Sequence, residues 1–228
     1  MRYCLFNGIF FCCHRESGCV VEVLAFIIII LIASLLQTST GFGFSILATP
    51  FLLLLFDPFE AIQINLILSL LISSALMMKI RKDIDFGILR RFVVGSVIGL
   101  PIGIMFFLLI NIDHIKLGVS IIILLLTSML MFKFRISQNK QRDVLVGGLS
   151  GLLTTSIGMP GPPILLYFSG TDTQKEKLRG TTLAFYLFTY FVSLIIQVIF
   201  VGTNKTVWIS SLWALPLVFA GLYLLKVL

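Results

Sequence analysis

Charged residues are scarce in this sequence. Asp, Glu, Lys and Arg make up 12% of its 228 residues, whereas a typical soluble domain carries about 25%. Hydrophobic residues make up 58%, and the mean hydropathy is +1.10. A soluble core cannot absorb so many apolar side chains, so the composition excludes an ordinary soluble domain and indicates a membrane protein.

Ionisable residues are also missing from seven long apolar runs, which cover residues 23–56, 61–78, 92–111, 117–132, 144–170, 180–204 and 206–225. Each run has roughly the 20 residues that cross a bilayer as a helix. Helix is the expected state, because lipid cannot satisfy backbone groups and no alternating barrel pattern appears. Without clustered Asp, Glu, His or Cys in these runs, we expect no enzyme, no cofactor and no intramembrane proton relay.

Cysteine occurs only before the first long run. Cys4, Cys12, Cys13 and Cys19 surround His14, but their spacing matches no zinc pattern, so no metal site is expected. The short apolar run before Cys13 also fits a signal peptide poorly. We interpret residues 1–22 as an amino-terminal extension that is not part of the fold.

The formal net charge of +7 comes from basic residues in short loops rather than on one face of a domain, so no nucleic-acid partner is expected. Lys and Arg concentrate in loops 79–91 and 133–143, while the intervening loop 111–116 has few. The two basic loops are two spans apart and therefore on one face. The positive-inside rule assigns that face to the cytoplasm.

Internal repetition is the most informative pattern. Ser34 to Phe42 aligns with Gly151 to Met159 at an offset of 117, with identities that include Thr38/Thr155 and Gly41/Gly158. This pattern predicts an all-α polytopic membrane protein made of two tandem repeats of about four transmembrane segments each. Repeat 1 is assigned to 23–139 and repeat 2 to 140–228, and by this count the last span of repeat 2 is missing.

The first segment of each repeat is expected to break. The run 23–56 would be about 51 Å long as a helix, too long for one upright span and too short for two. Its Gly-containing stretch 38–43, with Pro50 beyond, matches the Gly/Pro motif 155–163. Counting each broken segment as one net crossing gives four crossings per repeat, which predicts repeats that run parallel.

Paired broken helices in two halves point to a transporter's binding site. A half-helix that restarts after a break offers free N–H groups and a positive dipole end, which suit an anion. Close helix packing by small residues is the alternative for either motif. The candidate substrate-binding residues are Thr38, Ser39, Thr40, Gly41, Gly43, Asn65, Thr155, Ser156, Gly158, Gly161, Arg179 and Thr182.

Several of these residues have a second interpretation. Arg179 could attract an anion or anchor its helix at the membrane surface. Gln63 and Asn65 could face the cavity or bond to a neighbouring helix. Tyr186 and Tyr190 share a helical face and are interpreted as packing residues.

Three motifs carry a family resemblance: Gln37-Thr-Ser-Thr-Gly-Phe-Gly-Phe-Ser-Ile-Leu-Ala-Thr-Pro50, Gly158-Met-Pro-Gly-Pro-Pro163 and Arg179-Gly-Thr-Thr-Leu183. From Val23 to its end the sequence resembles the TauE/SafE sulfite exporter family. The resemblance implies an inner-membrane permease of seven or eight spans that moves sulfite, organosulfonates or related anions. Its expected partners are this small-molecule anion and the lipid bilayer, with a homo-oligomer left open. The alternative is a membrane accessory or assembly subunit that does not transport.

Overall fold

The computed structural model describes residues 16–80, 83–109, 139–169 and 174–227, and isolated positions between 117 and 128; side chains of 16–20, 79 and 224–227 are outside this description. The described residues form helices and no strand, which confirms the all-α prediction. The helices are α1 (Glu16–Thr40), α2 (Phe44–Leu55), α3 (Pro58–Ile80), α4 (Phe86–Leu109), α6 (Lys140–Ile157), α7 (Gly161–Ser169), α8 (Lys175–Phe200) and α9 (Lys205–Val227).

Five of these helices are long and apolar enough to cross a membrane: α1, α3, α4, α8 and α9. α2 is apolar but has only 12 residues, which rise about 18 Å. The predicted loop 111–116 and cysteines 4, 12 and 13 lie outside the described residues, as does most of the predicted span 117–132. The described helices alone therefore give an all-α fold with five candidate membrane spans.

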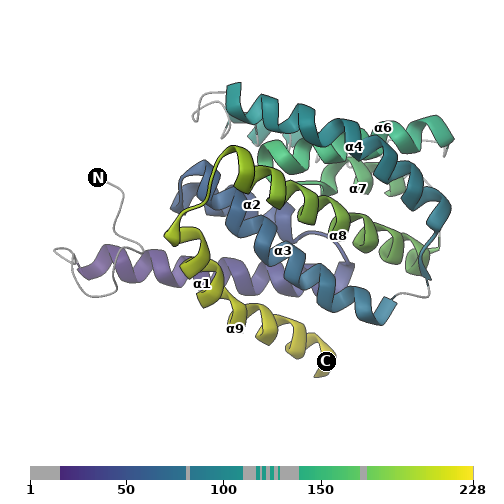
Figure 1. Ribbon diagram of the computed structural model, residues 1–228. Coiled ribbons are helices and arrows are strands. Elements are labelled where there is room, and N and C mark those ends of the chain that lie inside the picture. The colour runs from purple at the N-terminus through teal and green to yellow at the C-terminus, as the bar shows by residue number, and fades with distance from the viewer. Residues whose placement is uncertain are drawn as a thin grey trace.

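The helices lie side by side in three groups. α3 packs against α8 at the centre, α4 packs against α6 on one side, and α1 packs against α9 on the other. Figure 1 shows this order, with the short helices α2 and α7 beside the central pair. The centre of the molecule is thus built from α2, α3, α7 and α8.

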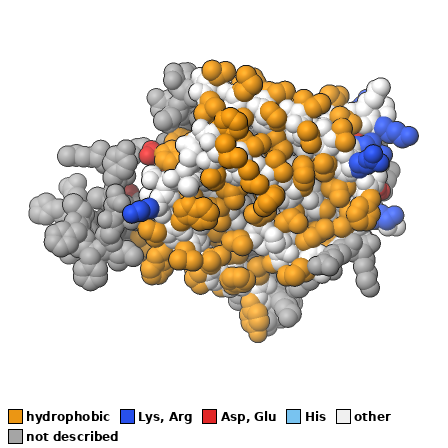
Figure 2. Space-filling view, viewed as in Figure 1, with side chains coloured by type: hydrophobic (Ala, Val, Ile, Leu, Met, Phe, Trp, Pro, Cys, Tyr) orange, Lys and Arg blue, Asp and Glu red, His pale blue; other side chains and the backbone are white. Residues whose placement is uncertain are grey.

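Apolar side chains cover the outer surface of the bundle, as Figure 2 shows for one face. α4 exposes Val97, Ile98 and Met105, while α9 exposes Trp208 and Leu212. A continuous apolar surface of this kind is unfavourable in contact with water but not in contact with lipid. This surface is the one expected to face the bilayer.

Each broken segment is a helical hairpin rather than a single crossing. The ring of Phe26, in the first half of α1, lies 5.7 Å from that of Phe56, which follows α2. Likewise the Tyr167 hydroxyl near the end of α7 donates to Asp143 near the start of α6. The second arm therefore returns toward the beginning of the first, so the prediction of one net crossing per broken segment is wrong.

α3 and α8 run antiparallel. Gln63, near the start of α3, donates to the Gly202 carbonyl beyond the end of α8 at 2.7 Å. At the other end, Gly180 in the first turns of α8 packs on the backbone of Asp83, which follows α3. These helices occupy matching positions at the offset of 117, so the parallel arrangement predicted from the crossing count is also wrong. The error follows from the hairpins, because each removes one crossing from the count.

The described parts of the two basic loops lie on the same face. Arg91 in the first turns of α4 pairs with Asp143 in the first turn of α6, at 2.5 Å between Nε and Oδ2. The start of α8, with Lys175 and Lys177, joins this face through the contact of Gly180 with Asp83. We call this end of the bundle the basic face; in Figure 2 its Lys and Arg side chains gather at the right.

Candidate functional site

Glycines in a left-handed backbone conformation make both helix breaks. Gly41 has a φ of 85° and follows α1, while Gly158 has a φ of 76° and follows α6. A side chain disfavours this conformation, which is why glycine commonly ends helices. The predicted breaks at 38–43 and 155–163 are thus confirmed, and the half-helices α2 and α7 restart within a few residues.

Side chains from other helices satisfy the carbonyl groups left open at these breaks. Arg179 of α8 donates to the Thr38 carbonyl at the end of α1. At the end of α6, Gln197 donates to the Thr155 carbonyl at 2.7 Å and Asn65 donates to the Gly158 carbonyl at 2.8 Å. Both breaks are therefore fixed against the central pair α3 and α8.

The hydroxyl groups predicted at the breaks bond within their own helices. Thr38 donates to the Ser34 carbonyl at 2.7 Å and Thr155 donates to the Gly151 carbonyl at 3.3 Å. Ser39, Thr40 and Ser156 make similar bonds to carbonyls three or four residues earlier. These five hydroxyls would have to turn away from their helices before they could reach a ligand.

The first turns of the two half-helices lie against each other. A Cβ at Gly161, the first residue of α7, would lie 2.9 Å from Ile46 of α2 and 3.1 Å from the Tyr186 hydroxyl. α2 begins after Gly43 with no side chain capping its N-terminus. No side chain at the N-cap therefore satisfies its first-turn N–H groups, and these groups carry the positive end of the helix dipole.

The two half-helices do not offer equal donors. Pro162 and Pro163 occupy the first turn of α7, and proline has no N–H group. α7 can supply its dipole and the Gly161 N–H, whereas α2 can supply the N–H groups of a complete first turn. Pro162 and Pro163 are the signal in the sequence that the two half-helices differ.

Buried polar side chains recur along one side of α3 and one side of α8. Asn65, Ser69 and Ser73 on α3 recur at every fourth position, as do Thr182, Tyr186 and Tyr190 on α8; all six are at most 1% exposed. We call these six residues the polar seam. The Tyr190 hydroxyl donates to Ser45 of α2 at 3.0 Å and also lies beside Ser69.

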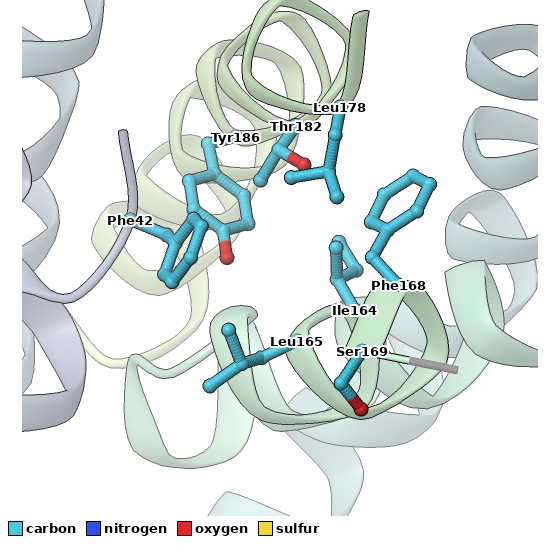
Figure 3. A pocket seen from close by; sticks show the side chains of 8 residues that line it. All are labelled: Phe42, Ile164, Leu165, Phe168, Ser169, Leu178, Thr182 and Tyr186. Carbon is cyan, nitrogen blue, oxygen red and sulfur yellow. The ribbon is translucent and has the colours of Figure 1, made fainter. Parts of the chain in front are cut away.

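A cavity of about 140 Å³ lies beside the seam, toward the basic face. Figure 3 shows Phe42 from the α1–α2 turn on one side, with side chains of α8 and α7 closing the others. Its apolar lining is Phe42, Ile164, Leu165, Phe168 and Leu178, and its polar lining is Ser169, Thr182 and Tyr186. The space admits several waters or one small anion.

Two hydroxyls in this cavity have no hydrogen-bond partner. Thr182 Oγ1 and the Tyr186 hydroxyl are buried and unpaired, although most buried polar atoms in proteins are paired. Of the candidates named from the sequence, the cavity brings in Thr182 directly. Arg179 lies over the α1–α2 turn, where its side chain contacts Gly41.

Sequence reasoning placed Tyr186 and Tyr190 among packing residues and did not identify Ser45, Ser69 or Ser73. One signal could have found Ser69 and Ser73: at the offset of 117, Asn65, Ser69 and Ser73 align with Thr182, Tyr186 and Tyr190. Three polar positions at helical spacing, matched between two apolar runs, are unexpected from packing alone.

Groups of three or more His, Cys, Asp or Glu that could hold a metal ion are absent among the described residues. His14 and Cys4, Cys12 and Cys13 lie outside that part of the chain. The donors at the centre are hydroxyls, amides and main-chain N–H groups. Such a set suits an anion better than a cation.

A sequence model of the family described as "Sulfite exporter TauE/SafE" matches residues 26–227. The match covers most of the chain, including both breaks, the polar seam and the cavity. No curated protein and no solved structure matches the chain significantly.

Proposed function

The chain belongs to the TauE/SafE sulfite exporter family, and from this premise we propose that it is a secondary permease for a small sulfur-containing anion, such as sulfite or an organosulfonate. The family is one of membrane transporters and not of enzymes. The described helices agree with a multi-pass membrane protein.

The observation that carries the proposal is the pair of unpaired hydroxyls in the cavity. Thr182 and Tyr186 are buried without partners next to the first turns of α2 and α7. An unpaired buried hydroxyl costs about 1–3 kcal/mol, so a ligand in the cavity that accepts both O–H groups would stabilise the site. An anion would accept both O–H groups and would face the positive end of α2.

The rest of the site supports the same ligand. Arg179 contacts the α1–α2 turn, whose Phe42 lines the cavity, and Asn65 contacts the α6–α7 turn. A positive end of the bundle attracts anions before they enter, and the basic face supplies it. We place the substrate between Thr182, Tyr186, Gly161 and the first turn of α2, near Gly43.

Flux of radiolabelled sulfite in proteoliposomes tests this function directly. The wild-type protein should exchange or release sulfite, and Thr182→Val and Tyr186→Phe should each lower the flux about tenfold or more, since hydrogen bonds to a charged group contribute roughly 1.5–3 kcal/mol. Neither variant should reduce thermal stability, because each removes a hydroxyl that has no partner in the protein.

Thr189→Val is the matched control. Thr189 is equally buried on α8, but its hydroxyl bonds to the Phe185 carbonyl of its own helix at 3.0 Å. This variant should transport sulfite at close to the wild-type rate. Wild-type protein that is correctly inserted and carries neither sulfite nor an organosulfonate would instead support the accessory-subunit alternative.

A further inference from the structure

The offset of 117 relates helix boundaries as well as residues. α1 ends at Thr40 and α6 at Ile157; α2 begins at Phe44 and α7 at Gly161; α3 begins at Pro58 and α8 at Lys175. Each pair differs by 117. A duplicated unit of hairpin and long helices accounts for these boundaries, with the first unit in 23–139 and the second in 140–228.

Helix packing follows the same correspondence, in which α1, α2, α3 and α4 are exchanged with α6, α7, α8 and α9. Under this exchange the α4–α6 pair becomes α9–α1, the α3–α9 pair becomes α8–α4 and the α1–α2 pair becomes α6–α7. Each of these pairs is in contact. The α3–α8 and α2–α7 pairs exchange into themselves. Because α3 and α8 run antiparallel, this exchange turns the molecule over, as in transporters built from inverted repeats.

The same exchange assigns a counterpart to the cavity. Its lining residues Phe42, Leu165, Leu178, Thr182 and Tyr186 correspond to Met159, Ala48, Ala61, Asn65 and Ser69. Met159, Ala48 and Ala61 are fully buried and pack together in one hydrophobic cluster. This side is therefore closed by packing, and it lies toward the face opposite the basic face, where α3 begins.

We infer that the anion has a second docking place, closed in this structure, between the first half of α3, α2 and the α6–α7 turn. Asn65 and Ser69 would take there the roles that Thr182 and Tyr186 take in the open cavity. Ser69 already carries a buried hydroxyl without a partner, which can donate a hydrogen bond to an anion. The inference rests on the proposed function, since it makes the two docking places the ends of one transport cycle.

Inverted repeats give a physical reason for the asymmetry. Two units of similar sequence can exchange conformations, so that the unit packed tightly in one state becomes the loose one in the other. The conformation of each unit then indicates the conformation that the other unit adopts in the second state. In that state the cavity beside Thr182 closes and the one beside Ser69 opens.

Cysteine accessibility separates the two states without any flux measurement. In a background with the four native cysteines replaced by serine, Gln174→Cys and Thr203→Cys mark the basic and opposite faces, because both positions are exposed. An impermeant methanethiosulfonate reagent is applied to one face at a time. Ala61→Cys and Ser69→Cys should react from the Thr203 face only, and Leu178→Cys from the Gln174 face only.

Ser96→Cys is the matched buried control, because Ser96 is fully buried where α4 packs on Gly151 of α6 and lines neither docking place. Ala61→Cys and Ser69→Cys should react at least tenfold faster than Ser96→Cys. Equal rates, or reaction from the basic face, would overturn the second docking place. The labelling is carried out without sulfite, which reacts with the reagent, so a protein without flux can still pass or fail this test.

Discussion

Several buried polar side-chain atoms of this bundle have no hydrogen-bond partner, and two of them lie in the cavity. The hydroxyls of Thr182 and Tyr186 are unpaired and face a cavity. The hydroxyls of Thr38 and Thr155, by contrast, donate to carbonyl groups of their own helices. At the scale of single residues, an unpaired hydroxyl that also lines the cavity distinguishes a candidate ligand contact from a structural one.

Asp143 shows a second residue-scale effect. Its side chain is 1% exposed, and its carboxylate pairs with Arg91 of α4 and accepts a hydrogen bond from Tyr167 of α7. The counterpart position at the offset of 117 is Phe26, which closes the other hairpin through its ring contact with Phe56. The two hairpins are thus held by different chemistry: a buried charge at the basic face and an aromatic pair at the opposite face.

Replacing Gly158 by alanine should destabilise the protein through both strain and contact. Its φ of 76° is unfavourable for an L-residue by about 1–2 kcal/mol. A Cβ there would also lie 3.0 Å from Asn65 Nδ2 and press on the bond that caps α6. We expect the midpoint of thermal unfolding in detergent to fall by several degrees.

Gly202→Ala is the control for strain alone, because Gly202 has a φ of 86° but no atom within 4 Å of an added Cβ. Gly158→Ala should therefore unfold at a lower temperature than Gly202→Ala. If the two variants unfold together, the contact with Asn65 contributes nothing and the α6–α7 turn is not fixed by α3.

At the scale of elements, the sequence predicts the existence of each helix well. Absence of charge marks α1, α3, α4, α8 and α9 as spans, because lipid excludes charged side chains regardless of packing. The positions of both breaks also follow from Gly41 and Gly158. These features depend on local chemistry, which a sequence carries directly.

The path of the chain after each break could not be predicted in this way. A glycine turn permits α2 to continue across the membrane or to fold back along α1, and both choices leave the hydropathy unchanged. The choice is made by contacts between distant residues, such as Phe26 with Phe56 and Asp143 with Tyr167.

The α4–α6 pair depends on glycine for close approach. A Cβ at Gly147 would lie 2.6 Å from the Phe92 Cα, whereas one at the adjacent Gly148 would meet its nearest atom, the Gly95 carbonyl oxygen, at 3.4 Å. Gly147→Ala should therefore push the helices apart at a cost of about 1–3 kcal/mol.

Gly148→Ala tests the same helix without the overlap. It should be neutral or slightly stabilising, because alanine favours helix over glycine by about 1 kcal/mol. Thermal unfolding of the two purified variants compares them directly. Similar losses from both would show that helix separation is not what Gly147 prevents.

At the scale of the whole molecule, the concentration of basic residues and the cavity lie toward the same end of the bundle. The basic face contains the end of α3 and the starts of α4, α6 and α8, while the opposite face has Asp57, Glu60 and Lys205. The cavity beside Thr182 lies toward the basic face. An export substrate would therefore enter the cavity from the side on which positive residues attract it.

The positive-inside rule assigns the basic face to the cytoplasm, and intact cells test this assignment. In the cysteine-free background, an impermeant thiol reagent added outside should label Thr203→Cys and should label Gln174→Cys only after the membrane is permeabilised. Both positions are exposed, so reactivity reports the side and not burial. The reverse pattern would place the cavity on the outer side, and the transporter would then be loaded from outside in this conformation, as an importer would be.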